Sequence, residues 1–106
     1  MRTRVTQDEA MIERFRGDPG FALNVVNGVL EHGDQAELLR VLRQLAQASG
    51  GVQSVAEAAQ LNPTQLYRTL SPKGNPSLSS LMSILKAMGL RLSIQPLDPS
   101  PPHRPN

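Results

Sequence analysis

Helix-start signals recur along most of the chain, and they constrain its fold more than any other feature. Six segments open with a residue whose side chain can cap a free backbone N–H: Thr6 with Glu9, Asp18 with Pro19, Asp34, Ser54 with Glu57, Asn62 with Pro63, and Ser77. Apolar residues follow each signal at helical spacing, and Gly17, Gly33, Gly50 and Gly89 end four of the runs. The sequence predicts an all-α fold, a small helical bundle with helices over about 7–17, 19–32, 35–49, 55–60, 63–70 and 78–88.

The segment after the last predicted helix has a different pattern. Residues 90–95 alternate apolar and polar, which predicts a short C-terminal β-strand whose apolar face holds Leu90, Leu92 and Ile94. No other part of the chain is an obvious mate, so we expect the strand to pair with residues 3–6, with a second copy or with another protein. Residues 96–106 include five prolines and no apolar periodicity, which predicts a disordered tail.

Composition excludes several classes of function. The chain has no cysteine and two histidines, His32 and His103, which argues against disulfides, Cys-based zinc sites and a histidine-based metal or catalytic centre. We find no nucleophile–base set and no glycine-rich phosphate loop, so we expect no enzyme activity, no cofactor and no metal. No apolar run is long enough to span a membrane, and no signal peptide precedes the first helix, so we expect a cytoplasmic protein with no membrane partner.

Charge is distributed unevenly between the two parts of the chain. Residues 1–37 hold four arginines and seven carboxylates, whereas residues 38–106 hold seven basic and two acidic residues. An uneven distribution of this kind suggests a polyanion as partner of the basic part and a different partner for the acidic part. An ordinary charged surface would also account for it.

The fourth and fifth predicted helices have the dimensions of a helix-turn-helix. Ala58 is predicted at the close-packing site of the first helix, and Leu66 and Leu70 share one side of the second. Thr64 and Arg68 then fall on the opposite side, with Gln65 and Tyr67 flanking them. Glu57 is the single carboxylate between residues 54 and 95.

The side chains on this outer face suit recognition of DNA in the major groove. Gln65 can bind adenine, Arg68 can bind guanine, and Thr64 offers a hydroxyl and a methyl group, so these three are the predicted base contacts. The predicted contacts to the DNA backbone are Gln53, Ser54, Asn62, Tyr67, Lys73 and Ser77. Short helices with polar outer faces also occur in bundles that bind no DNA. Tyr67 in particular can instead pack on the following loop.

The same region resembles a known family. The run Leu66-Tyr67-Arg68-Thr69-Leu70-Ser71-Pro72-Lys73-Gly74-Asn75-Pro76 is similar to the Xre-type (lambda-repressor-like) helix-turn-helix of HigA-like probable addiction-module antidote proteins. Further similarity lies at Leu30-Glu31-His32-Gly33-Asp34 and at Leu85-Lys86-Ala87-Met88-Gly89-Leu90-Arg91-Leu92. The resemblance extends over about residues 21–94.

The resemblance implies an antitoxin that binds and neutralises a toxin of the RelE/ParE superfamily and represses its own operon. Taken with the patterns above, it divides the chain into three predicted regions: an N-terminal helical region over 1–33 that can bind the toxin, a DNA-binding domain over 34–95 that includes the strand, and the proline-rich tail over 96–106. One recognition helix reads few base pairs, so we expect a homodimer on double-stranded palindromic operator DNA. The alternative is a stand-alone, phage-like repressor with the same DNA-binding domain and no toxin partner.

Overall fold

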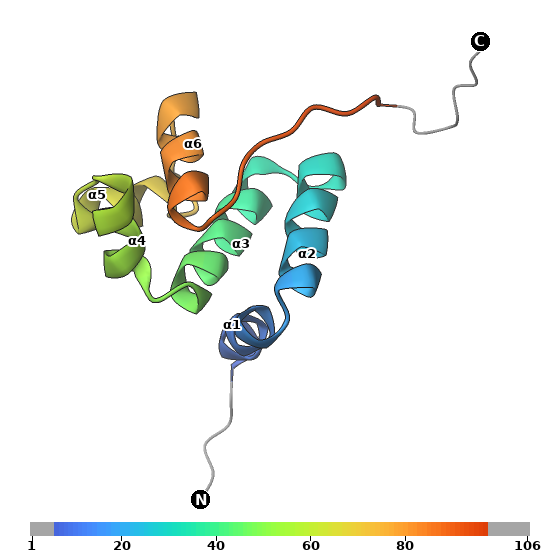
Figure 1. Ribbon diagram of the computed structural model, residues 1–106, viewed down its shortest axis with the longest axis horizontal. Coiled ribbons are helices and arrows are strands. Elements are labelled where there is room, and N and C mark those ends of the chain that lie inside the picture. Colours follow the sequence, from blue (N-terminus) through green and yellow to red (C-terminus); the bar gives the residue numbers. More distant parts are fainter. Residues whose placement is uncertain (1–5, 98–106) are drawn as a thin grey trace, which may run out of the picture.

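The structure is a computed structural model that describes residues 6–97, and these residues form six helices with short connections (Figure 1). The helices are α1 (Gln7–Gly17), α2 (Pro19–His32), α3 (Gln35–Ala48), α4 (Val52–Ala59), α5 (Pro63–Thr69) and α6 (Leu78–Ala87). The predicted all-α fold is confirmed for this part of the chain. None of these helices is both long and apolar enough to cross a membrane. Residues 98–106, which make up most of the predicted tail, lie outside the described residues, as do residues 1–5.

Five of the six predicted helix starts are confirmed by their capping hydrogen bonds. At α1 the capping box is complete, because Glu9 N–H donates to Thr6 Oγ1 (3.0 Å) and Thr6 N–H donates to Glu9 Oε1 (3.1 Å). The remaining four caps are Asp18 at α2, Asp34 at α3, Asn62 at α5 and Ser77 at α6. Each satisfies backbone N–H groups that a helix leaves unpaired in its first turn.

The start of α4 differs from the prediction. Ser54 is not its cap: the helix begins at Val52, and Gly51 occupies the N-cap position without a side-chain hydrogen bond. The earlier start buries Val52 to 2% exposure. Burying a valine side chain stabilises a fold by about 1.5–3 kcal/mol, whereas a side-chain cap contributes about 1 kcal/mol. The close-packed alanine of this helix is also not the predicted Ala58, which is exposed, but Ala56, which is completely buried.

Helix α3 crosses the middle of the molecule and contributes to both clusters of buried side chains (Figure 1). On one side, its residues Leu39, Leu42 and Ala46 pack with α4, α5 and α6. On the other side, Val41 and Leu45 pack with α1 and α2. The partners in the first cluster are Val52, Val55, Ala56, Leu66, Leu70, Ile84 and Leu85, and those in the second are Phe15, Ala22 and Val26. Because both clusters share α3, they form a continuous support for the shorter helices.

The C-terminal strand predicted over residues 90–95 is not formed. The Leu90 N–H donates to Leu85 O (2.8 Å), and the Leu90 side chain packs against both clusters, so this residue belongs to the core of its own chain. Residues 91–97 then run as an exposed segment without regular secondary structure. A strand needs a neighbour that accepts and donates its backbone hydrogen bonds, and the described residues place none beside it.

Candidate nucleic-acid interface

The outer side of α5 carries the three side chains predicted to contact bases. Thr64, Gln65 and Arg68 are all exposed. Leu66 and Leu70, which lie on the opposite side, are both 0% exposed and belong to the core beneath α5. The structure therefore orients this segment as its periodicity predicts, with leucines inward and polar side chains outward.

Local interactions explain why the segment adopts this orientation. The Asn62 carboxamide oxygen accepts from the backbone N–H groups of Thr64 (2.8 Å) and Gln65 (3.3 Å), which starts the helix. Pro63 occupies the first helical position, where its missing N–H removes no hydrogen bond. Once Leu66 and Leu70 are both buried, a period of 3.6 residues leaves Thr64 and Arg68 facing solvent.

The exposed face of α5 forms one continuous polar surface. Thr64 and Arg68 are four residues apart, and Gln65 and Arg68 are three apart, so their side chains are neighbours on the helix. Together they present a hydroxyl, a carboxamide and a guanidinium group. Helix α5 contains no acidic residue, and Arg68 lies in its last turn. This surface can donate several hydrogen bonds and carries net positive charge.

The residues predicted to contact the DNA backbone lie in and around α5. Some of their polar groups are exposed, whereas others already make capping hydrogen bonds. Gln53 and Ser54 are exposed in the first turn of α4, and Lys73 is exposed in the turn that follows α5. Tyr67 is also exposed, by 52%. The Asn62 side chain is engaged in capping α5, as described above. The Ser77 hydroxyl likewise accepts from the Ser80 N–H at the start of α6.

Three features that hold α5 in place were not predicted from the sequence. Gln60 ends α4 in the left-handed conformation (φ 61°, ψ 42°), which turns the chain toward α5. The Arg43 guanidinium on α3 donates to Leu70 O at the end of α5 (2.8 Å). A Cβ added at Gly74 would lie 1.9 Å from Thr69 O, so the backbone after α5 packs directly on its last turn. Of these three features, only Gly74 can be recognised in the sequence, because a glycine next to Asn75-Pro76 indicates a turn. The Arg43 hydrogen bond joins residues 27 positions apart, and no local pattern indicates it.

The exposed side chains around α5 are polar and include no cluster of metal ligands among the described residues. Within residues 6–97, no group of three or more His, Cys, Asp or Glu side chains lies close enough together to hold a metal ion. The polar groups on α5 are side chains of kinds that bind nucleobases and phosphates.

Comparison with known proteins gave one family. The model of a family described as "probable addiction module antidote protein" matches residues 18–96. A relative from Haemophilus influenzae, described as an uncharacterized protein, is 29% identical over 70 residues, which cover 66% of this chain and 71% of the relative. No solved structure matched the chain. The family match includes α2 to α6 and the whole surface of α5.

Proposed function

We propose that this chain, which belongs to the family of probable addiction module antidote proteins, is the antitoxin of a type II toxin–antitoxin module. Membership of the family suggests an antitoxin role and implies a toxin partner of some kind. In our proposal the protein binds and neutralises a toxin of the RelE/ParE type and represses its own operon by sequence-specific binding to DNA. Its N-terminal region, residues 1–33, contributes to toxin binding, and residues 34–95 bind DNA.

The exposed polar face of α5 above two completely buried leucines is the observation that carries the DNA-binding part of the proposal. In this proposal α4 and α5 form a helix-turn-helix of the Xre type, and α5 enters the major groove. Thr64, Gln65 and Arg68 contact base edges, and Gln53, Ser54, Asn62, Tyr67, Lys73 and Ser77 lie near phosphates. Asn62 and Ser77 then contribute chiefly by fixing helix ends at the surface of the duplex, since their side chains already act as caps.

Binding to an operator of useful length requires two copies of α5. We therefore propose a homodimer on a palindromic site whose half-sites lie about 34–36 Å apart, one turn of the double helix. The exposed segment 91–97, with Leu92 and Ile94, supplies a contact to a partner, either the second copy or the toxin. Leu90, by contrast, anchors this segment to its own core.

A gel-shift titration with the DNA upstream of the gene tests the DNA-binding part. We expect a shift at low salt, weakened steeply as salt rises because bound phosphates release counterions. Footprinting should protect two symmetric half-sites. Failure to shift this DNA at low salt, under conditions where the protein is folded, would refute the assignment of α5 as a recognition helix.

Co-expression with the product of the adjacent small open reading frame tests the toxin-binding part. We expect co-purification of the two proteins and rescue of growth when the neighbour is expressed. A chain that binds its own promoter but has no such neighbour, and rescues nothing, would instead be the stand-alone repressor. Gene order therefore separates the two candidates before any assay is done.

A further inference from the structure

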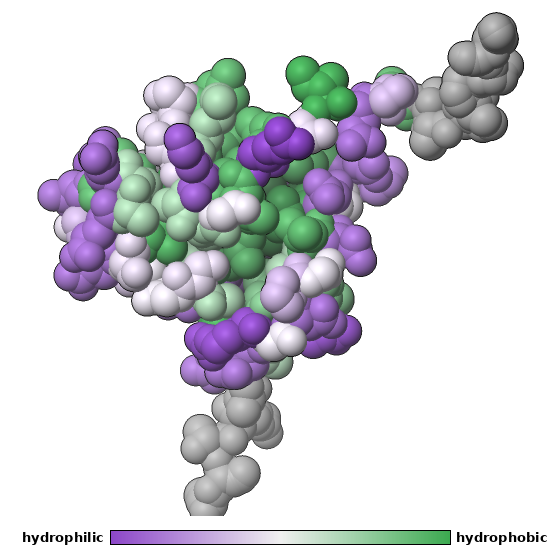
Figure 2. All heavy atoms as spheres, in the orientation of Figure 1, coloured by the Kyte–Doolittle hydropathy of each residue, from purple (hydrophilic) through white to green (hydrophobic). Residues whose placement is uncertain are grey.

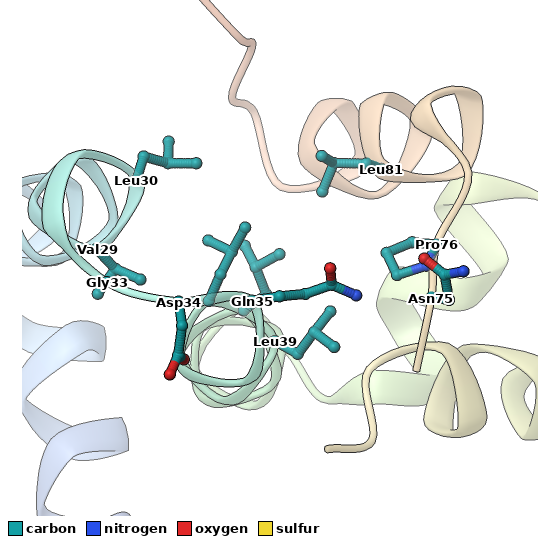
Figure 3. Close-up of a pocket in the computed structure, with 11 residues that line it drawn as sticks. Val29, Leu30, Gly33, Asp34, Gln35, Leu39, Asn75, Pro76 and Leu81 are labelled. Atoms are coloured by element: carbon teal, nitrogen blue, oxygen red, sulfur yellow. The ribbon is translucent and has the colours of Figure 1, made fainter. Parts of the chain in front are cut away.

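An apolar groove separates α2 from α6 and has α3 as its base. Leu30 from α2 and Leu81 from α6 face each other across it, and Leu39 of α3 lies beneath them (Figure 3). The groove has a volume of about 260 Å³. At one end the Gln35 side chain donates to Gly74 O (3.1 Å), which ties α3 to the loop before α6. The valine and leucine residues that line the groove are Val29, Leu30, Leu38, Leu39, Leu42 and Leu81.

The walls of this groove continue into exposed apolar side chains. Leu30 is 48% exposed on α2, and on α6 Leu78 is 66% and Met82 is 52% exposed. Figure 2 shows hydrophobic side chains gathered between α6 and α2 on the face drawn there. An apolar area of this kind is typical of a contact surface for another protein chain.

The segment 91–97 carries exposed apolar side chains of the kind that an apolar groove accommodates. Ile94 is 99% exposed and Leu97 is 101% exposed, so their side chains gain nothing from folding of the single chain. Among the described residues, no backbone–backbone hydrogen bond involves residues 91–97. The segment leaves the core at Leu90, runs between α6 and α2 and then leads outward beyond them (Figure 1). None of its residues lines the groove, and at about 3.3 Å per residue it extends far enough to reach a neighbour.

We infer that the groove between α2 and α6 receives Ile94 from a second copy of this chain. The inference rests on the homodimer in the proposed function and names the contact that forms it. Each copy carries one groove and one segment, so two copies related by a two-fold axis satisfy both grooves at once and form a closed dimer.

Charge favours the same occupant. Arg91 is exposed and is the single charged residue of the segment 90–97. Glu31, whose carboxylate is exposed, follows the groove residue Leu30 at the end of α2. A segment that enters the groove from a second copy brings Arg91 toward this carboxylate. Helices α4 and α5 lie at the opposite end of the molecule from α2 (Figure 1), so this contact leaves the exposed face of α5 free.

Disulfide trapping tests the contact cleanly, because the native chain contains no cysteine. Leu30→Cys protein is mixed with Ile94→Cys protein under mild oxidation, and the products are identified by mass spectrometry without reductant. We expect a covalent dimer that joins the two variants. Leu23→Cys replaces Leu30→Cys as the matched control: Leu23 is exposed by 43% on the same face of α2, about 10 Å away along the helix axis, and it does not line the groove. This control should give little product.

Sedimentation analysis of Ile94→Asp gives an independent measure. Since Ile94 is exposed in the single chain, its replacement should leave thermal unfolding of the monomer unchanged. The dissociation constant of the dimer should rise about 100-fold, because each dimer loses two apolar contacts worth roughly tenfold each.

Three results would overturn the inference, and they bear differently on the proposed function. A native chain that is monomeric at tens of micromolar removes the homodimer as well. A stable dimer that yields covalent dimers of Ile94→Cys alone, and none with Leu30→Cys, indicates that the two segments pair with each other and leaves the homodimer intact. A monomeric chain that loses toxin binding on Leu30→Asp assigns the groove to the toxin, in agreement with the antitoxin role but not with this inference.

Discussion

Arg68 and Lys73 are both exposed cations, but their positions suggest different contributions to the DNA binding that we propose. Arg68 lies on the outer face of α5, next to Thr64 and Gln65, where the proposed complex places base edges. Lys73 lies in the turn after α5, at the edge of the same surface. A guanidinium group can recognise guanine through two hydrogen bonds, whereas an ammonium group near phosphate acts as a point charge.

Replacing these residues separates the two contributions. Arg68→Ala or Gln65→Ala should weaken binding to the operator by about 1–3 kcal/mol and relax the preference at one base position. Lys73→Ala should weaken binding to all sequences and reduce the dependence of binding on salt by about one unit of slope. Competition gel shifts with operator and random DNA at several salt concentrations measure both effects.

Arg16→Ala is the matched control, since it removes an exposed cation from α1, on the other side of α3 from α5. It should change neither affinity nor specificity appreciably. Equal losses on operator and random DNA for Arg68→Ala, Gln65→Ala and Lys73→Ala would contradict the division into base and backbone contacts.

Gly74 is required by close packing of backbone on backbone. A Cβ at this position would lie 1.9 Å from Thr69 O and 2.9 Å from Arg68 O, both in the last turn of α5. Because these are backbone atoms, no side-chain rotation can relieve the overlap. Gly74→Ala should lower the free energy of unfolding by about 3 kcal/mol, the upper end of the usual penalty for overpacking.

Gly28→Ala makes the same chemical change, but we expect it to raise the free energy of unfolding. A Cβ added at Gly28 meets nothing within 4 Å, and the residue lies inside α2, where alanine is favoured over glycine by up to about 1 kcal/mol. Urea titration followed by circular dichroism compares the two variants with the native chain. A Gly74→Ala protein as stable as the native chain would show that the turn after α5 is arranged differently.

At the scale of the elements, α5 is a helix of 7 residues that depends on its neighbours. A helix this short is marginal in isolation, so tertiary contacts provide most of its stability. Leu66 and Leu70 supply the apolar contact, and the Arg43 guanidinium on α3 donates to Leu70 O at its C-terminal end. Arg43 therefore helps to set the orientation of the surface that carries Arg68.

Arg43→Met tests this contribution, because methionine keeps an unbranched stem but cannot donate. The loss of a hydrogen bond from a charged donor at a partly buried site should lower the free energy of unfolding by about 1.5–3 kcal/mol. Hydrogen exchange of the α5 amides should accelerate more than that of the α2 amides. Arg40→Met is the control: Arg40 is exposed on α3 one turn earlier, and its replacement should have little effect. Uniform acceleration in all helices would argue against a local contribution of Arg43.

At the scale of the whole molecule, the acidic side chains of the first part are exposed but also take part in local structure. Asp8 accepts from Gln44 Nε2 (2.6 Å), Glu9 completes the capping box of α1, and Asp18 caps α2. Glu13 pairs with Arg16, and Glu31 lies near His32 at the end of α2. The contribution to toxin binding that we propose for the N-terminal region is therefore best tested at Glu13 and Glu31, which cap no helix.

Glu13→Gln combined with Glu31→Gln should slow association with a cationic toxin. Charges at the edge of an interface act mainly on the association rate. At low salt the rate constant should fall about fivefold for each exposed pair between a carboxylate and a cation of the toxin that is removed. Stopped-flow measurements over a range of salt concentrations detect this effect. Glu57→Gln removes an exposed carboxylate from α4 and is the matched control, with no change expected. A rate that is insensitive to both salt and these variants would exclude steering by the acidic part.

The sequence by itself determined the helical class, five of six helix starts and the two faces of α5. Capping hydrogen bonds and helical periodicity connect residues at most a few positions apart, so they can be read along the chain. Only the tertiary structure decided where α4 begins, that Ala56 rather than Ala58 is buried, and that Leu90 joins the core while residues 91–97 form no strand. It also decided how Arg43 and Gly74 hold α5. These outcomes depend on competition for buried space and on contacts between residues distant in sequence. Neither effect can be inferred from local sequence patterns.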